Sequence, residues 1–138
     1  MKIIKNGTYI STPDKLRKAI EHFSVEDKLQ AQDFDPYNPI EGEVTAIKTT
    51  GVCSQQYSIN NKLFVENDVE FYVNREGSWS WKTTENLLVG DYLLTDHSKL
   101  ERIEQLSHLD TVLKGCILTS DSNFYAGGYL VKWANEYY

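Results

Sequence analysis

Two cysteines and three histidines are the side chains of this sequence best suited to covalent or acid–base chemistry. A cysteine thiolate is a strong nucleophile, and a histidine exchanges protons near neutral pH. Cys53 and Cys116 lie far apart, without a Cys-x-x-Cys partner or a pair of histidines nearby, so their spacing does not predict a metal site. We expect each thiol to be a small buried side chain within a strand, and a disulfide between them stays open.

The three histidines lie in segments that do not favour catalysis. His22 falls near the end of a predicted helix, where the helix dipole favours a positively charged ring. His97 and His108 fall in polar turns. We therefore predict no catalytic histidine and no metal or other cofactor.

The charge balance argues against nucleic acid and membrane partners. The chain has 14 basic and 20 acidic side chains, a net charge of −6, and no run of Lys or Arg that would neutralise phosphates. Aromatic residues make up 12%, but without a basic groove they do not predict single-strand binding. Residues 1–6 are too polar for a secretion signal, and no apolar run approaches the roughly 20 residues of a spanning helix. We expect synthesis in the cytoplasm.

The segment after residue 11 is the one place where the sequence favours a helix. Thr12-Pro13-Asp14 combines a capping hydroxyl, a proline suited to the first helical position and an acid for the positive end of the dipole. Apolar side chains then recur at helical spacing, at Leu16, Ala19, Ile20 and Phe23. This spacing predicts a short amphipathic helix over residues 13–22.

Most of the remaining sequence has the composition of short strands, rich in β-branched and aromatic residues. Turn signals separate the predicted strands, which cover residues 43–49, 52–59, 62–65, 69–74, 79–81, 92–94, 100–106, 112–118 and 129–133. Without helices between the strands, the pattern predicts an all-β sandwich or barrel-like body. Residues 33–39 contain two prolines and no periodicity, and we predict a loop there.

The sequence also contains an internal repeat. Val25-Glu26-Asp27-Lys28-Leu29 recurs as Val89-Gly90-Asp91-Tyr92-Leu93, at a constant offset of 64 residues. The flanks keep the same order, since Glu43-Val44 corresponds to Arg102-Ile103. A period this long exceeds that of solenoid repeats and indicates a duplicated half-domain.

Four segments, in order, make the sequence similar to a known family. They are Gly-Thr-x-Ile-x-Thr at 7–12, Ala-Ile-x-x-Phe-x-Val-x-Asp-x-Leu at 19–29, Val-Gly-Asp-x-Leu at 89–93 and Asn-Phe-Tyr-Ala-Gly-Gly-Tyr-Leu-Val at 123–131. Together they resemble the Hint family, the self-processing module of inteins and hedgehog carboxy-terminal domains. The resemblance covers about residues 3–133 and implies a compact all-β horseshoe with internal pseudo-two-fold duplication. We expect one such domain over residues 1–138, with one short N-terminal helix and a short aromatic tail at 134–138.

The residues that the family's reaction requires are missing. The family uses a first Cys or Ser as nucleophile, a Thr-x-x-His pair that polarises the preceding peptide bond, a later His, and a closing His-Asn pair. The matching positions here hold Ile3, Glu66, Val69, Ser122, Lys132 and Trp133. None of them supplies the missing group, so the resemblance predicts a degenerate domain without catalytic residues.

Loss of the chemistry on a kept scaffold predicts a non-catalytic structural or interaction module. We expect a subunit of a larger assembly, such as a tail or baseplate component of a bacteriophage virion, with other protein subunits as partners. Aromatic side chains make good interface anchors, and the candidate interface residues are Trp79, Trp81, Tyr137 and Tyr138. Trp79 and Trp81 alternate on one predicted strand and so face the same side of it. The alternative to an interface role is that both are buried in the core.

Two other functions stay open. A residual self-processing or thiol-dependent enzyme would use Cys116 or Cys53 as a displaced nucleophile. A soluble small-ligand or peptide binder would use an exposed strand edge. A cleaved or thioester-linked product in the intact mass would reveal the enzyme, and absence from any larger particle would favour the binder.

Overall fold

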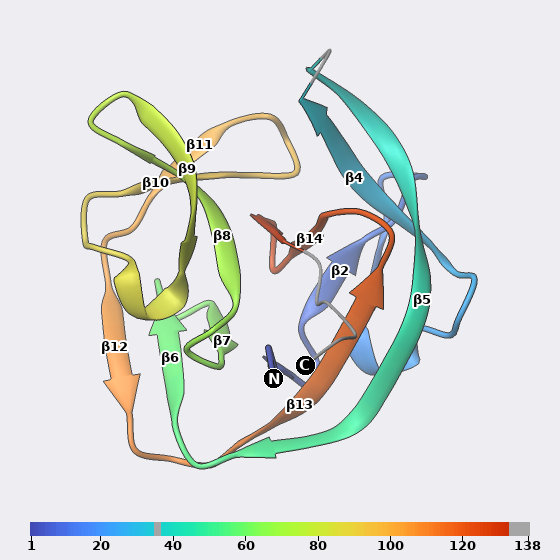
Figure 1. Ribbon diagram of the computed structural model, residues 1–138, viewed down its shortest axis with the longest axis horizontal. Coiled ribbons are helices and arrows are strands. Elements are labelled where there is room, and N and C mark those ends of the chain that lie inside the picture. The colour runs from blue at the N-terminus through green and yellow to red at the C-terminus, as the bar shows by residue number, and fades with distance from the viewer. Residues whose placement is uncertain (35–36, 133–138) are drawn as a thin grey trace.

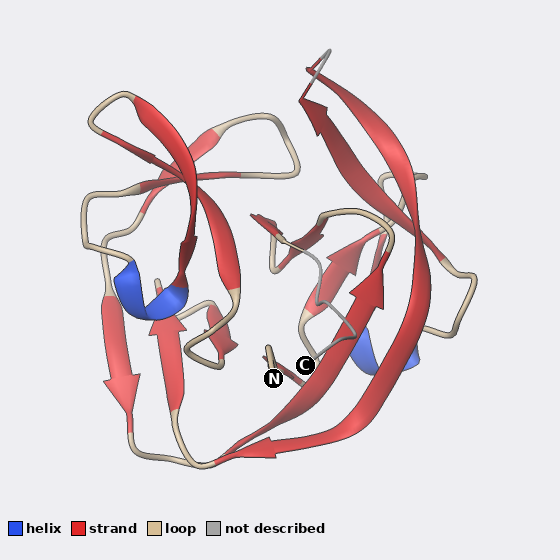
Figure 2. Cartoon of the chain, viewed as in Figure 1, coloured by secondary structure: helices blue, strands red, loops and turns tan. Residues whose placement is uncertain are grey.

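The computed structural model describes residues 1–34 and 37–132, which form mostly short strands, one long strand and two single 3₁₀ turns (Figure 2). The elements are β1 (Ile4–Lys5), β2 (Tyr9–Ser11), β3 (Arg17–Ala19), η1 (Ile20–His22), β4 (Lys28–Phe34), β5 (Tyr37–Cys53), β6 (Gln56–Ile59), β7 (Leu63–Val65), β8 (Glu70–Arg75), β9 (Ser78–Thr83), η2 (Thr84–Asn86), β10 (Tyr92–Leu94), β11 (Leu100–Arg102), β12 (Leu106–Leu109), β13 (Leu113–Ser120), β14 (Phe124–Ala126) and β15 (Tyr129–Val131). The predicted all-β class is confirmed.

The strands pair antiparallel in two curled sheets, and each sheet runs from one arm of a horseshoe to the other (Figure 1). The seven-stranded sheet has the order β12-β6-β7-β1-β13-β5-β4. The eight-stranded sheet has the order β11-β10-β8-β15-β14-β2-β3, with β9 paired to β8. Strands from opposite ends of the chain therefore lie side by side, as β1 does with β13 and β2 with β14.

The core fills the space within the horseshoe. Strands β14 and β15 are buried along their whole length, as expected of strands covered on both faces. In β4 and β8, buried residues alternate with more exposed ones, as in strands with one covered face. The largest fully buried side chains include Tyr125, Tyr129, Phe71 and Phe124.

The repeat in the sequence is a repeat in the structure. In the first copy, Val44 accepts a hydrogen bond from the Glu26 amide (2.8 Å) and donates one to the Asp27 carbonyl (2.9 Å). The equivalent bonds of the second copy are from Gly90 N–H to Ile103 O (2.9 Å) and from Ile103 N–H to Asp91 O (2.8 Å). Glu26 and Gly90 share a positive φ of 78° and 100°. The two copies of the pseudo-two-fold repeat thus form equivalent main-chain hydrogen bonds.

The predicted helix over residues 13–22 is wrong. Residues 12–16 form the tight turn of the β2–β3 hairpin, in which Thr12 N–H donates to Leu16 O at 3.0 Å and Lys15 has a φ of 64°. The Asp14 carboxylate accepts from the Leu16 amide at 3.2 Å and from the Thr12 hydroxyl. Thr, Pro and Asp favour turns for the same reasons that they favour helix starts. Only Ile20–His22 make a helical turn, the 3₁₀ element η1.

The predicted loop over residues 33–39 is also wrong. Its described residues continue the β4–β5 hairpin, in which Asp33 pairs with Asn38 and Gln32 with Pro39. The Gln32 amide donates to Asn123 Oδ1 at 2.8 Å and so points away from β5. Pro39 therefore sits at a non-hydrogen-bonded pair, where a residue without an N–H removes no ladder bond.

Candidate functional site

The position that matches the Hint nucleophile is buried in the centre of the molecule. Ile3 directly precedes β1 and is fully buried. Its amide donates to Glu66 Oε1 at 3.1 Å, and its carbonyl accepts from the Glu66 amide at 2.8 Å. Its side chain lies against two paired glycines, Gly51 and Gly115. A Cβ added to Gly51 would lie 3.1 Å from the Ile3 side chain, and one added to Gly115 would lie 3.0 Å from it. An alkyl group that cannot act as a nucleophile fills this place.

Three carboxylates gather beside Ile3, on the segment that leads into β8. Glu66, Asp68 and Glu70 face positive charges from both ends of the described chain. The ion pairs include Met1 N to Asp68 Oδ2 (2.5 Å), Lys2 Nζ to Glu70 Oε2 (3.6 Å) and Lys132 Nζ to Glu70 Oε2 (3.9 Å). This cluster neutralises its own charges and contains no thiol, hydroxyl or imidazole.

The structure brings four of the six family positions together at the start of β8. They are Ile3, Glu66, Val69 and Lys132. Val69 is a core residue, and the Lys132 amide donates to the Glu70 carbonyl at 2.9 Å. Ser122 lies elsewhere, in the β13–β14 turn, where its hydroxyl occupies the space that a Cβ on Gly42 would need. Trp133 lies outside the described residues.

Cys116 is a buried thiol in the central sheet. It lies on β13 opposite Ile4 and donates a hydrogen bond to Asn6 Oδ1 at 3.2 Å. Burial, with the negative charge of Glu21, raises the pKa of the Cys116 thiol to about 11. The Cys116 thiol is therefore protonated near neutral pH, whereas a nucleophilic cysteine must be a thiolate.

Cys53 is also a protonated thiol. It lies at the end of β5 and donates to the Gln55 carbonyl at 2.9 Å. Burial and the negative charge of Glu66 raise the pKa of Cys53 above its ordinary value. Both cysteines are free, so no disulfide joins them. Among the residues that the structure describes, no histidine is bonded to either thiol.

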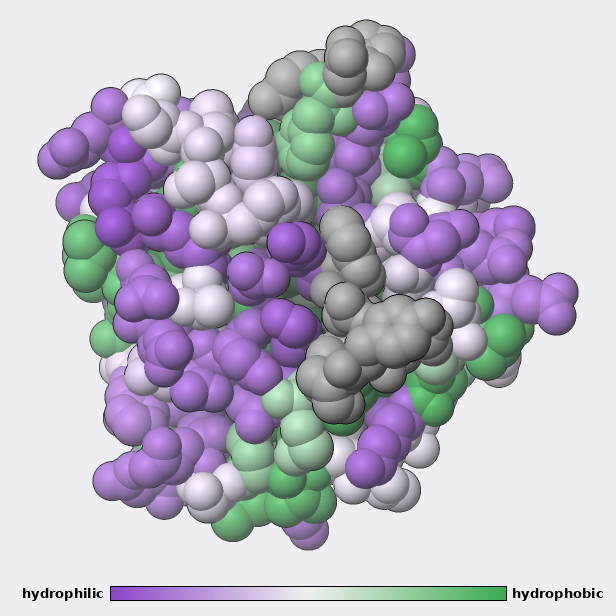
Figure 3. Space-filling view, in the orientation of Figure 1, coloured by the Kyte–Doolittle hydropathy of each residue, from purple (hydrophilic) through white to green (hydrophobic). Residues whose placement is uncertain are grey.

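Trp79 and Trp81 belong to an aromatic cluster at the surface and not to the core. Both project from β9 onto Tyr72 of β8, with ring centroids 4.8 and 5.0 Å away. Phe34, at the end of β4, lies 4.6 Å from Tyr72 and thereby joins the two sheets. The surface over β8 and β9 is pale and borders a hydrophobic strip at the end of β4 (Figure 3). Tyr137 and Tyr138 lie outside the described residues.

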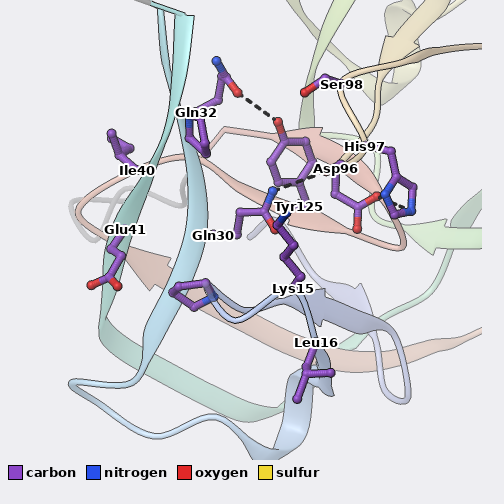
Figure 4. Close-up of a pocket in the computed structure, with 12 residues that line it drawn as sticks. Lys15, Leu16, Gln30, Gln32, Ile40, Glu41, Asp96, His97, Ser98 and Tyr125 are labelled. Atoms are coloured by element: carbon purple, nitrogen blue, oxygen red, sulfur yellow. Dashed lines mark hydrogen bonds and ion pairs between the residues drawn. The ribbon is translucent and has the colours of Figure 1, made fainter.

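A hollow of about 560 Å³ opens between the β4–β5 hairpin and the turns after β2 and β10. Figure 4 shows Gln30 and Gln32 of β4 pointing across it toward Asp96 and Tyr125. The Tyr125 hydroxyl donates to Gln32 Oε1 at 3.4 Å, and Gln30 Nε2 donates to the Asp96 carbonyl at 3.3 Å. Burial and the charge of Asp96 raise the pKa of Tyr125 to about 12, so its hydroxyl keeps its proton as a donor.

Sequence reasoning missed Asp96. Its carboxylate is only 7% exposed and accepts hydrogen bonds from Ser11 (2.8 Å) and Arg17 (3.2 Å), which come from a distant part of the chain. The polar run from Thr95 to Ser98 indicates a turn, and no pattern in it points to residues 11 or 17. The three side chains meet because β3 pairs with β2 and β2 with β14, while a Thr95–Tyr129 bridge and a bond from Asp96 N–H to Gly128 O hold the Asp96 turn to β15.

Within residues 1–34 and 37–132, no three His, Cys, Asp or Glu side chains are placed to hold a metal ion. Nor does any helix in that part of the chain have the length and apolar character needed to cross a membrane.

Two curled antiparallel sheets, a pseudo-two-fold repeat and a first strand in the centre define the class: the chain has the intein-like, or Hint, fold. Among solved structures it is similar to a bacterial intein-like domain from Clostridium thermocellum, with a TM-score of 0.79 and 22% identity over 97% of this chain and 99% of that one. A DnaB intein from Synechocystis sp. PCC 6803 gives a TM-score of 0.76 and 17% identity, over 98% and 100% of the two chains. The TvoVMA intein gives a TM-score of 0.77 and 12% identity, over 94% of this chain and 96% of that one.

These identities establish the fold alone. No protein-family model and no curated protein sequence matches the chain.

Proposed function

We propose that this chain is a non-catalytic structural or interaction module on a Hint scaffold. The observation that carries the proposal is Ile3, a buried alkyl side chain where the Hint reaction needs a nucleophile. The groups around it support the same proposal, because Glu66 binds the Ile3 amide, Val69 packs in the core and Lys132 pairs with Glu70. The raised pKa values of both thiols count against a displaced nucleophile.

Intact-mass measurement of the full chain tests the absence of self-processing. We expect the mass of the complete sequence, unchanged after days near neutral pH and after addition of hydroxylamine or a small thiol, which cleave thioesters. The control is the double variant Cys53→Ser, Cys116→Ser, which should give the same result. A cleaved or thioester-linked product that this double variant lacks would overturn the proposal in favour of the thiol-dependent enzyme.

We further propose that the module joins other protein subunits through the aromatic cluster of Phe34, Tyr72, Trp79 and Trp81. Support comes from their half-buried rings, which offer large, rigid contact surfaces at little cost in conformational entropy. Tyr137 and Tyr138 are proposed as a second part of the interface. The narrower proposal, a tail or baseplate subunit of a bacteriophage virion, is supported by the resemblance to degenerate Hint domains alone.

Density-gradient fractionation of cells that make the chain tests the assembly. We expect the chain to travel with a particle, and Trp79→Ala or Trp81→Ala to reduce that fraction about tenfold or more, as interface anchors of this type do. Trp79→Phe and Trp81→Phe are the matched controls, because they keep an aromatic ring in the cluster. Deletion of residues 134–138 tests the tail separately. A chain that is monomeric in every fraction would contradict the assembly proposal.

A further inference from the structure

A smaller hollow of about 330 Å³ adjoins the first one at the turn between β10 and β11. Its lining consists of Arg17, Lys62, Thr95, Asp96, His97, Lys99, Leu100, Glu101 and Gly128. Three Lys or Arg side chains, from three separate segments, and one histidine meet here against two carboxylates. The chain as a whole has 14 basic and 20 acidic side chains and is net negative, whereas the lining of this hollow is net positive.

On one side of this hollow, Asp96 holds Arg17 in place. The Asp96 carboxylate is buried against Ser11 and accepts a bond from Arg17 Nη2 at 3.2 Å. The Arg17 side chain is 47% exposed, and within the described chain only its Nη2 is hydrogen-bonded. A guanidinium carries five N–H donors in a planar fork, so most of those of Arg17 are available to a ligand.

On the other side, Glu101 and Tyr129 hold Lys62. The ammonium lies 3.5 Å from Glu101 Oε1 and 4.8 Å over the Tyr129 ring, with the side chain 47% exposed. Glu101 also accepts hydrogen bonds from the Tyr129 hydroxyl and from Asn60, which turn it inward. Although burial pushes the pKa of Glu101 upward, these bonds and the charge of Lys62 hold it below its ordinary value, so it stays ionised.

Gly128 lies between Lys62 and Asp96, with a positive φ of 89° that favours glycine. A Cβ at this position would lie 3.9 Å from Lys62 Nζ and 3.8 Å from Asp96 Oδ1. Lys99 lines the third side with an exposed side chain, which has no ion pair within residues 1–34 and 37–132. Each of the two carboxylates thus anchors one cation, and the Arg17, Lys62 and Lys99 side chains stay exposed.

We propose that this hollow binds a carboxylate group on an acidic segment of a partner protein. The inference rests on the proposed interaction function and names the chemistry of the partner. With His97 uncharged, the hollow has one net positive charge, from the three cations Arg17, Lys62 and Lys99 and the two carboxylates of Asp96 and Glu101. One carboxylate balances that charge, and its two oxygens match the donor fork of Arg17. A phosphate dianion would bring excess negative charge against the two carboxylates of the wall.

Titration of the full chain with an uncharged-ended peptide of four glutamates, followed by amide chemical shifts at low ionic strength, tests this site. We expect shifts at Thr95, Lys99 and Gly128, and a dissociation constant that rises with salt. Lys99→Glu should weaken binding at least about tenfold, because it removes one charge-assisted hydrogen bond and adds a charge that repels the ligand. The matched control is Lys114→Glu, the same charge change at an exposed position of β13, which should weaken binding less than about twofold.

Three outcomes would overturn the proposal. They are no shifts at the hollow, equal weakening by both variants, and tighter binding of inorganic phosphate than of the peptide at the same residues. Failure of this titration is distinct from failure of the proposed function, because an unprocessed chain that still joins a particle through the aromatic cluster would leave that function standing. A self-processed mass, in contrast, would remove the function whatever the peptide does.

Discussion

Replacement of Asp91 by alanine should destabilise the fold much more than the same replacement of Asp27, although the two aspartates are equivalent in the repeat. Each accepts a hydrogen bond from the amide three residues earlier, Leu88 at 2.9 Å and Ser24 at 2.8 Å. Each also forms an ion pair with a basic side chain from a neighbouring strand. The molecule therefore contains a matched pair of sites that differ in burial.

The difference in burial sets the magnitude. Asp91 is 3% exposed and receives two hydrogen bonds of 2.8 Å from the Arg75 guanidinium, whereas Asp27 is 33% exposed and receives one from Lys18. Breaking a buried pair costs about 3–5 kcal/mol, and an exposed pair contributes about 0.2–1 kcal/mol. Because Arg75 is partly exposed and can be rehydrated, we expect about 3 kcal/mol for Asp91→Ala and about 1 kcal/mol for Asp27→Ala.

Urea unfolding followed by tryptophan fluorescence measures both losses, and acid supplies a second test. Although burial pushes the pKa of Asp91 upward, the bonds from Arg75 and the Leu88 amide hold it below its ordinary value. A depressed folded-state pKa gives stability that is present above the unfolded pKa of about 4 and is lost as pH falls through the folded value. The gap between the wild type and Asp91→Ala should therefore narrow below about pH 4.

Two results would refute this reasoning. Equal losses at the two sites would mean that burial of the ion pair does not set its contribution. A gap that stays constant from neutral pH into acid would mean that the Asp91 carboxylate contributes nothing as an ion.

Three further predictions follow from the contacts of Ile3, Gly42 and Cys116. Ile3→Ala should lower the free energy of unfolding by about 3 kcal/mol in urea, since it leaves a cavity beside two glycines; a loss below about 1 kcal/mol would contradict tight packing there. Gly42→Ala should lower the free energy of unfolding by about 2 kcal/mol, because its Cβ would overlap the Ser122 hydroxyl. A second substitution, Ser122→Gly, should restore most of that loss, and a double variant as unstable as Gly42→Ala alone would disprove the overlap. Cys116 should react with iodoacetamide at least about tenfold more slowly than Cys53 in the native chain, read by mass, and equally fast in denaturing urea; equal native rates would argue against its burial.

The parts of the fold that the sequence predicts are those in which local pattern and tertiary role agree. The repeat of Asp27 at Asp91 was visible because turn geometry demands the same residue type in both halves. Predicted strands such as residues 92–94 coincide with observed ones, and in this strand a buried residue lies between two more exposed ones. The helix over residues 13–22 failed because its capping signals also serve a hairpin turn, and no local pattern tells the two apart.

The candidate sites show the same limit. Trp79 and Trp81 share a face because strands alternate, and this much is readable from spacing. That Phe34 completes their cluster is not readable, since it belongs to the other sheet. Arg17, Lys62 and Lys99 meet at one hollow only through the pairing of distant strands, and their spacing in the sequence carries no trace of it.

The central position of β1 has a consequence for the order of events during synthesis. Ile4 pairs with Val65 on one side and with Cys116 on the other. A nascent chain therefore carries its first strand without either neighbour until β7 has left the ribosome, and without the second until β13 has followed. Contacts between such distant segments form slowly, because the intervening chain must close a long loop first. The pairing of β1 on both of its sides is therefore complete only after translation has passed β13.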